Sequence, residues 1–172
     1  DEKSRRRAEI ISEQVRRVTN LIETLLNIAR PHEMIRSPIR VADIADHALD
    51  FFREKLRSRA IEVDRNYGDA AEILGDKDRL EQTFLNLIVN AADAKPQGGK
   101  LSVSVGTAAD DWVEFTIRDT GSGIEEDRLE SIFEPFQTTK ARGEGTGLGL
   151  VVCRSIVLAH HGTVSYTHLR AH

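Results

Sequence analysis

Apolar residues recur every three or four positions over the first thirty residues of the chain. The recurring residues are Ile11, Val15, Val18, Ile22, Leu25 and Ala29. This spacing is the a/d seam of a helix that packs lengthwise on another helix, with charged residues outside the seam. Because a lone helix cannot bury such a seam against itself, the pattern predicts one long helix with a partner in a bundle or dimer. Packing on the chain's own domain is the alternative.

Two other patterns predict the rest of the fold. Alternation of apolar and polar residues predicts strands at 61–65, 73–74, 101–105 and 113–117, and a last strand that begins at Val164. Helical spacing predicts helices at 41–56, 76–94, 126–132 and 148–160.

Consecutive strands separated by helices indicate a two-layer α/β (α+β) sandwich, in which helices cover one face of a mixed sheet. One long helix, 1–30, precedes it. Residues 31–38, which contain two prolines, are expected to be a linker. The domain itself is expected to cover 39–165, and residues 166–172 form an atypical tail.

Composition narrows the class of protein. With 172 residues, 40% hydrophobic and 30% charged, the chain fits one modest domain plus an appendage. A net charge of −4 favours neither nucleic acid nor a membrane surface as a partner. No apolar run approaches the ~20 residues of a membrane span, and the first residues do not form a signal peptide. A single cysteine, Cys153, favours a reducing, cytoplasmic location, which leaves open an anchor upstream of Asp1.

The helix predicted at 76–94 carries a polar stripe on an otherwise apolar surface. Gln82, Asn86, Asn90 and Asp93 follow one another at helical spacing. A buried stripe of this kind needs partners, and an amide oxygen is a suitable ligand for Mg²⁺. A stripe that faces bulk water is the alternative.

Asp119 ends a predicted strand on the same side as Val113, Phe115 and Ile117. A carboxylate on a core-facing side needs a donor, and the exocyclic amine of adenine is one. The alternative is an Asp-Thr-Gly turn in which the carboxylate bonds locally.

Glycines are concentrated beyond Asp119. Six of the twelve lie from Gly121 to Gly149, and the last of them open an apolar helix. Glycine lets the backbone approach a ligand closely, and a helix start offers free N–H groups to a phosphate. The glycine run follows no strand and lacks a Gly-Lys-Ser/Thr sequence, so neither a Rossmann site nor a P-loop is indicated. Thr138, Thr139 and Lys140 precede the run in a loop that could close as a lid.

The motifs Asn86-Leu-Ile-Val-Asn90, Asp119-Thr-Gly-Ser-Gly-Ile124, Phe133-Glu-Pro-Phe136 and Gly145-Thr-Gly-Leu-Gly-Leu150 occur in a fixed order. Together they resemble the asparagine, glycine and phenylalanine motifs of sensor histidine kinases, most closely the nitrogen-regulatory branch. That family shares the Bergerat ATP-binding fold with DNA gyrase, heat-shock chaperones and MutL. The leading helix resembles the second helix of the kinase dimerisation hairpin.

The resemblance implies roles for individual residues. Asn90 would coordinate Mg²⁺, Asn86 would support the triphosphate, and Asp119 would recognise adenine. The residues implied to bind ATP are Asn86, Asn90, Asp93, Asp119, Gly121, Gly123, Ile124, Phe136, Thr138, Thr139, Lys140, Gly145, Thr146, Gly147, Leu148 and Gly149. The implied reaction moves the γ-phosphoryl group of ATP to a histidine, for relay to an aspartate of a response-regulator receiver domain. The implied assembly is a homodimer through the N-terminal helix.

One position separates the branches of the superfamily, and one feature departs from the kinase family. ATPases related to gyrase carry a glutamate, which activates water, four residues before the metal asparagine, whereas this chain has Asn86, which cannot act as a general base. No acceptor histidine is identified, because His32 follows Pro31 in the expected linker, so phosphorylation in cis is not expected. A gyrase- or MutL-like ATPase and a degenerate nucleotide-binding or dimerisation module remain the alternatives.

Overall fold

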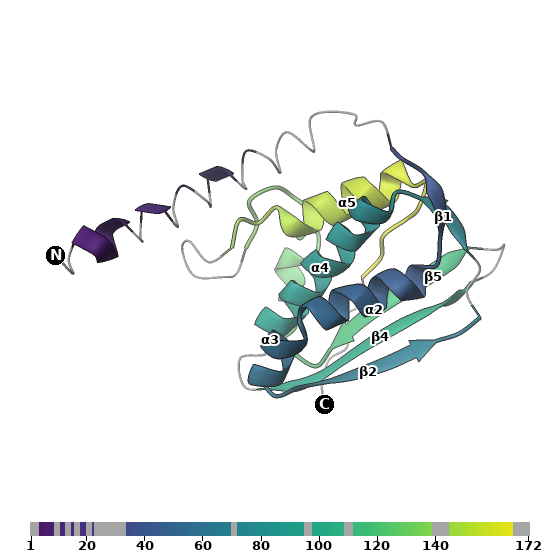
Figure 1. Ribbon diagram of the computed structural model, residues 1–172, viewed down its shortest axis with the longest axis horizontal. Coiled ribbons are helices and arrows are strands. Elements are labelled where there is room, and N and C mark those ends of the chain that lie inside the picture. Colours follow the sequence, from purple (N-terminus) through teal and green to yellow (C-terminus); the bar gives the residue numbers. More distant parts are fainter. Residues whose placement is uncertain are drawn as a thin grey trace.

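A computed structural model describes residues 4–8, 11–12, 15, 18–19, 22, 34–69, 72–94, 98–108, 112–138 and 145–166. Its main body has two layers, with the helices on one face of a three-stranded sheet (Figure 1). The sheet has the order β2 (Ile61–Tyr67), β4 (Gly99–Thr107) and β5 (Val113–Asp119). β2 runs parallel to β4, and β5 runs antiparallel to it. The mixed sheet and the one-sided helical layer confirm the predicted sandwich.

Alternation along β4 explains which face of the sheet is covered. Leu101, Val103 and Val105 are buried, whereas Ser102 and Ser104 point to the other face. They share one hydrophobic core with buried residues of α2 (Val41–Phe51), α4 (Lys77–Asp93) and α5 (Gly149–Ala159). The core therefore lies between β4 and the central helix α4.

α4 begins as the sequence predicts. The carboxylate of Asp76 caps the helix by accepting a hydrogen bond from the Arg79 N–H at 3.2 Å. Phe84 is fully buried on the sheet side of the helix, and its ring centroid lies 4.5 Å from that of Phe115 on β5. Burying a side chain of this size stabilises the fold by about 1.5–3 kcal/mol, which fixes α4 on the sheet.

The helix predicted at 41–56 is in fact two helices. α2 ends at Phe51, Phe52 lies in a turn, and α3 follows at Arg53–Ser58. Phe52 packs against the core at this break, and α3 then buries Leu56. The periodicity did not reveal the break, because both helices keep an apolar face toward the same core.

Two short strands form a separate ribbon. β1 (Ser37–Ile39) pairs antiparallel with β3 (Ile73–Gly75), so the strand predicted at 73–74 does not join the main sheet. β1 also occupies the end of the expected linker. The last predicted strand is wrong for the residues that the structure describes, since 162–166 form no strand and Val164 is 38% exposed. A short apolar alternation does not make a strand without a hydrogen-bonded neighbour.

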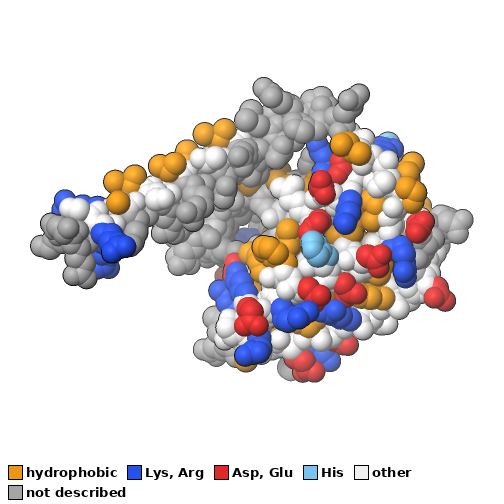
Figure 2. All heavy atoms as spheres, viewed as in Figure 1, with side chains coloured by type: hydrophobic (Ala, Val, Ile, Leu, Met, Phe, Trp, Pro, Cys, Tyr) orange, Lys and Arg blue, Asp and Glu red, His pale blue; other side chains and the backbone are white. Residues whose placement is uncertain are grey.

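The described residues of the N-terminal segment are helical and project away from the domain (Figure 1). Their apolar side chains form a row along the segment (Figure 2). Ile11 and Ile22, at its two ends, are 63% and 52% exposed. The described part of the seam is thus uncovered in a single chain. Its partner remains a prediction, and Leu25, Ala29 and the predicted helix end at 30–31 lie outside the described residues.

The C-terminus of α5 contains a residue in an unfavourable backbone conformation. His161 has φ +62°, and the hydrogen bonds from its N–H to Leu158 O and from Gly162 N–H to Val157 O form a Schellman motif. Glycine is the residue that this position favours. We expect His161→Gly to raise the free energy of unfolding by about 1 kcal/mol in urea denaturation.

His161→Ala is the control for this stabilisation, because alanine removes the ring but keeps the strained backbone. An equal gain in both variants would show that the side chain, and not the positive φ, causes the effect.

Candidate nucleotide-binding site

The antiparallel pair α4 and α5 forms the framework of the site. Asp76, at the start of α4, meets His160, at the end of α5, and Thr83 meets Cys153 midway. Toward the other end, the side-chain amide of Asn86 donates to the Gly149 carbonyl oxygen at 3.5 Å. The second half of α4 is therefore held beside the first residue of α5.

The polar stripe predicted on α4 lies at this end. Asn86 and Asn90 are half-buried, so the stripe does not simply face bulk water. A Cβ atom built on Gly149 would lie 3.8 Å from Asn90 Nδ2 and 3.9 Å from Asn86 Cγ. Two amide side chains thus converge on the backbone where α5 begins, as their assignment to one site requires.

The start of α5 can accept an anion. Leu148 is its N-cap and is buried, and the Leu148 side chain makes no capping hydrogen bond. The N–H groups of the first turn therefore have no acceptor within the helix and lie at the positive end of its dipole, next to Asn86, which contacts Gly149. Just before the helix, Thr146 Oγ1 accepts from the Leu148 N–H at 3.3 Å and holds the approach from Gly145.

Asp119 lies in a tight turn against the carboxyl end of α4. Its Oδ1 accepts a hydrogen bond from the Gly121 N–H at 2.7 Å, and Ser122 N–H donates to Ala94 O at 3.3 Å. A Cβ on Gly121 would lie 2.6 Å from Asp119 Oδ1 and 2.8 Å from Ala94, so only glycine fits. Asp119 is consequently held about one helical turn beyond Asn90.

The structure corrects one expectation for Asp119. The residue continues the register of Val113, Phe115 and Ile117, but it is exposed and not buried, and its carboxylate makes the local turn bond that was the alternative. The strand ends here, and so no helix covers this position as it covers the middle of β5.

The phenylalanine motif and the second glycine motif contact each other through their backbones. Phe136 has φ +68°, and its N–H donates to Gly147 O at 3.1 Å. A Cβ on Gly147 would lie 2.4 Å from the Phe136 carbonyl carbon. Phe133 attaches the same loop to α5, since Arg154 lies 5.7 Å from its ring centroid. The segment before α5 is thus fixed to the loop that follows β5.

The other predicted residues are only partly accounted for. The carboxylate of Asp93 accepts from Arg59 at 2.7 Å and lies 3.1 Å from Lys55 Nζ, so it links α4 to α3. Arg59 also donates to the Ala92 carbonyl oxygen, a contact for which the sequence gives no signal. Gly123, Ile124 and Thr138 are exposed in the loop after β5, and Thr139 and Lys140 lie outside the described residues.

Cys153 forms part of the wall between the two helices. Burial raises the pKa of its thiol to about 12, an effect that a hydrogen bond from Asn86 partly offsets. Its Sγ lies 3.7 Å from the Thr83 carbonyl oxygen. The thiol is therefore protonated near neutral pH and acts as a small packing group, not as a nucleophile.

A shallow hollow of about 260 Å³ lies elsewhere, between the start of α2 and the end of β2. Among its lining residues, Asp46 is paired with Arg65 and accepts from the Tyr67 hydroxyl. This hollow contains none of the motif residues, so the motifs and not the concavity of the surface locate the candidate site.

A family model described as "Histidine kinase-, DNA gyrase B-, and HSP90-like ATPase" matches residues 75–171. The chain belongs to this family. The match begins at the last residue of β3 and includes α4, β4, β5, α5 and the loops between them, so it contains every motif that builds the site.

The relatives of the chain are sensor histidine kinases. The sensor histidine kinase ZraS of Escherichia coli strain K12 is 35% identical over 158 residues, which are 91% of this chain and 33% of ZraS. The chain therefore spans about a third of the length of this curated relative. The Acinetobacter baumannii histidine kinase AdeS is 25% identical, with a TM-score of 0.76 over 93% of this chain and 76% of that one. The histidine kinase ThkA, solved with the response regulator TrrA, is 25% identical, with a TM-score of 0.73 over 89% of this chain and 43% of that chain.

These findings confirm the predicted family and fold. The chain contains the ATP-binding catalytic domain found in sensor histidine kinases. None of the described helices is both long and apolar enough to span a bilayer.

Proposed function

We propose that this chain binds Mg-ATP between α4, the turn after β5 and the start of α5, and transfers the γ-phosphoryl group to a histidine of the parent kinase. One observation carries the proposal: Asn86 and Asn90 converge on Gly149, at an uncapped helix start. Two amides beside a free helix start suit a metal-bound phosphate chain better than an apolar ligand.

Each part of the site has a chemical role in this proposal. Asp119 Oδ1 is held by Gly121, which leaves Oδ2 to accept from the adenine amine. The side-chain oxygen of Asn90 is a hard ligand for Mg²⁺, which when bound would neutralise phosphate charge. The first N–H groups of α5 would bind phosphate oxygens, and the joined loops at Phe136 and Gly147 would border the phosphates.

The reaction needs positioning more than covalent help from the protein. The bond between the γ-phosphorus and the bridging oxygen breaks, a bond to an imidazole nitrogen forms, and ADP leaves. Asn86 stands where related ATPases place a glutamate that activates water, and an amide cannot take that proton. Transfer to imidazole, which is itself a nucleophile, therefore suits this site better than hydrolysis.

The proposal includes two protein partners and a location. The uncovered seam of the N-terminal segment, with Ile11 and Ile22 more than half exposed, is suited to a second copy of the kinase. ThkA was solved with the response regulator TrrA, which supports a receiver domain as the acceptor of the phosphoryl group from histidine. Both partners and a reducing environment for Cys153 are consistent with a cytoplasmic location.

Label transfer from γ-labelled ATP tests this function. We expect the chain to phosphorylate a separately supplied hairpin of the parent kinase that bears a histidine, and we expect the product to be acid-labile and alkali-stable. Asn90→Ala is the control for the site, because it removes one amide from the helix surface and should abolish transfer. Bound ATP with no label on the hairpin would exclude the kinase function.

A further inference from the structure

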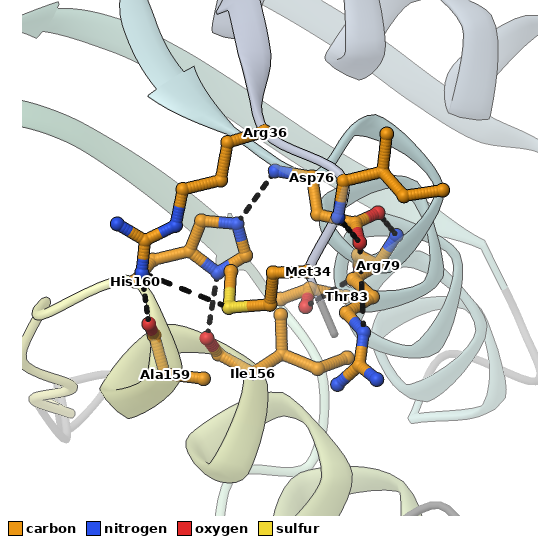
Figure 3. A network of polar contacts seen from close by, with 9 residues as sticks. Met34, Arg36, Asp76, Arg79, Thr83, Ile156, Ala159 and His160 are labelled. Carbon is orange, nitrogen blue, oxygen red and sulfur yellow. Dashed lines mark hydrogen bonds and ion pairs between the residues drawn. The ribbon is translucent and has the colours of Figure 1, made fainter. Parts of the chain in front are cut away.

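His160, at the end of α5, is bonded through both of its ring nitrogens (Figure 3). Nε2 accepts from the Asp76 N–H at 2.9 Å, and Nδ1 lies 2.8 Å from the Ile156 carbonyl oxygen. A backbone N–H can only donate and a carbonyl can only accept. In this arrangement Nε2 is the acceptor and Nδ1 the donor.

The charged side chains around this imidazole make their hydrogen bonds to other groups. The Asp76 carboxylate accepts from the Arg79 and Ile35 N–H groups, both at 3.2 Å, and thus faces α4 and the chain that enters β1. Arg36, in that entering chain, donates to Ala159 O at 3.3 Å and lies 3.5 Å from a ring nitrogen of His161. Gly75 of β3 lies close to the ring, since a Cβ atom at that position would be 3.1 Å from His160 Cδ2.

His160 and the candidate site lie at opposite ends of one helix pair. Ten residues of α4 separate Asp76 from Asn86, about 15 Å along the helix. Between them, the Thr83–Cys153 contact holds the two helices together. Because each helix is stiff, the attachment at the His160 end fixes how Gly149 is placed against Asn86 at the other end.

We propose that His160 is a positioning residue for nucleotide binding: its ring, bonded through Nε2 to the start of α4, sets the register of α5 on α4. This inference rests on the proposed function. A side chain with no acceptor at the position of Nε2 would leave the Asp76 N–H unpaired, so the hydrogen bond between the helices would be lost. Affinity for nucleotide should then fall, although no group of the candidate site itself has changed.

Two substitutions separate the functions of the two ring nitrogens. In His160→Gln, the side-chain oxygen reaches about as far as Nε2 and can accept from the Asp76 N–H. In His160→Asn, the side-chain amide can donate to Ile156 O but reaches no acceptor position for Asp76. Calorimetric titration with the Mg²⁺ complex of AMPPNP compares the two variants with the wild type.

We expect the wild type and His160→Gln to bind nucleotide with similar affinity, because both present an acceptor to the Asp76 N–H. His160→Asn should bind about fivefold more weakly than His160→Gln, the size of one lost hydrogen bond. His161→Gln removes the neighbouring imidazole and should keep the wild-type affinity.

Equal affinities for wild type, His160→Gln and His160→Asn would overturn the positioning role. A second readout does not depend on nucleotide: amide hydrogen exchange of Val152, whose N–H donates to Leu148 O at 3.0 Å, should be faster in His160→Asn than in His160→Gln. If the wild type binds no AMPPNP, the proposed function fails, and the exchange rates alone decide the role of His160: a difference supports it and equal rates overturn it.

Discussion

Replacing Asp119 by asparagine is expected to lower ATP affinity about a hundredfold while leaving the domain folded. The new side chain keeps an oxygen that can accept from the Gly121 N–H, as Asp119 Oδ1 does at 2.7 Å. Its NH₂ group then replaces Oδ2 and would face the adenine amine, so that two donors meet. Loss of a charged hydrogen bond with a donor left unpaired costs about 2–3 kcal/mol, which is the stated factor.

The measurement is calorimetric titration with ATP and GTP, together with thermal unfolding. The same NH₂ group can donate to the O6 acceptor of guanine, so the ratio of ATP to GTP affinity should fall even more than ATP affinity itself. Gly121→Ala is the complementary variant, because a Cβ 2.6 Å from Asp119 Oδ1 displaces the carboxylate without changing its chemistry. Unchanged ATP affinity in Asp119→Asn, with the protein folded, would show that adenine binds elsewhere.

The sequence predicted those features of the site that depend on periodicity within one element. Asn86 and Asn90 share a helix face because they are four residues apart, and Asp119 follows the register of β5 because strands alternate. Which elements meet at these faces depends on packing between distant segments. The contact between Asn86 and Gly149 joins positions 63 residues apart, and it became predictable only through the resemblance of the motifs.

The features that the sequence did not predict are short or depend on tertiary contacts. β1 has three residues, one of them Pro38, and its strand pairing with β3 leaves no pattern in so few positions. Likewise, the sequence does not distinguish His160 from any other polar residue at a helix end. Its role depends on the contacts of its two ring nitrogens with Asp76 and Ile156, which only the structure shows. Asp93 shares a helix face with the asparagines, but long cationic side chains from α3 and the turn after it reach its carboxylate.

Replacing Gly147 by alanine is expected to lower ATP affinity about tenfold to thirtyfold with little change in the melting temperature. Gly147 has φ +65°, a conformation that costs an L-residue about 1–2 kcal/mol. A Cβ there would also lie 2.4 Å from the Phe136 carbonyl carbon, where the neighbour is backbone and cannot rotate away. The hydrogen bond from Phe136 N–H to Gly147 O should break, and the loop before α5 should separate from the loop after β5.

Gly106→Ala is the matched control, because a Cβ at that strand position meets no atom within 4 Å and Gly106 has no positive φ. Titration with ATP measures the effect on binding, and limited proteolysis measures the effect on the loop. We expect weaker binding and faster cleavage between Phe136 and Gly147 in Gly147→Ala, and neither change in Gly106→Ala. If Gly147→Ala bound ATP as tightly as Gly106→Ala while its loop was cleaved faster, the contact between the two motifs would only order the loop. ATP binding would then depend on α4, the Asp119 turn and the start of α5, and not on the contact between the two motifs. Those three parts meet through Asn86, Gly121 and Gly149.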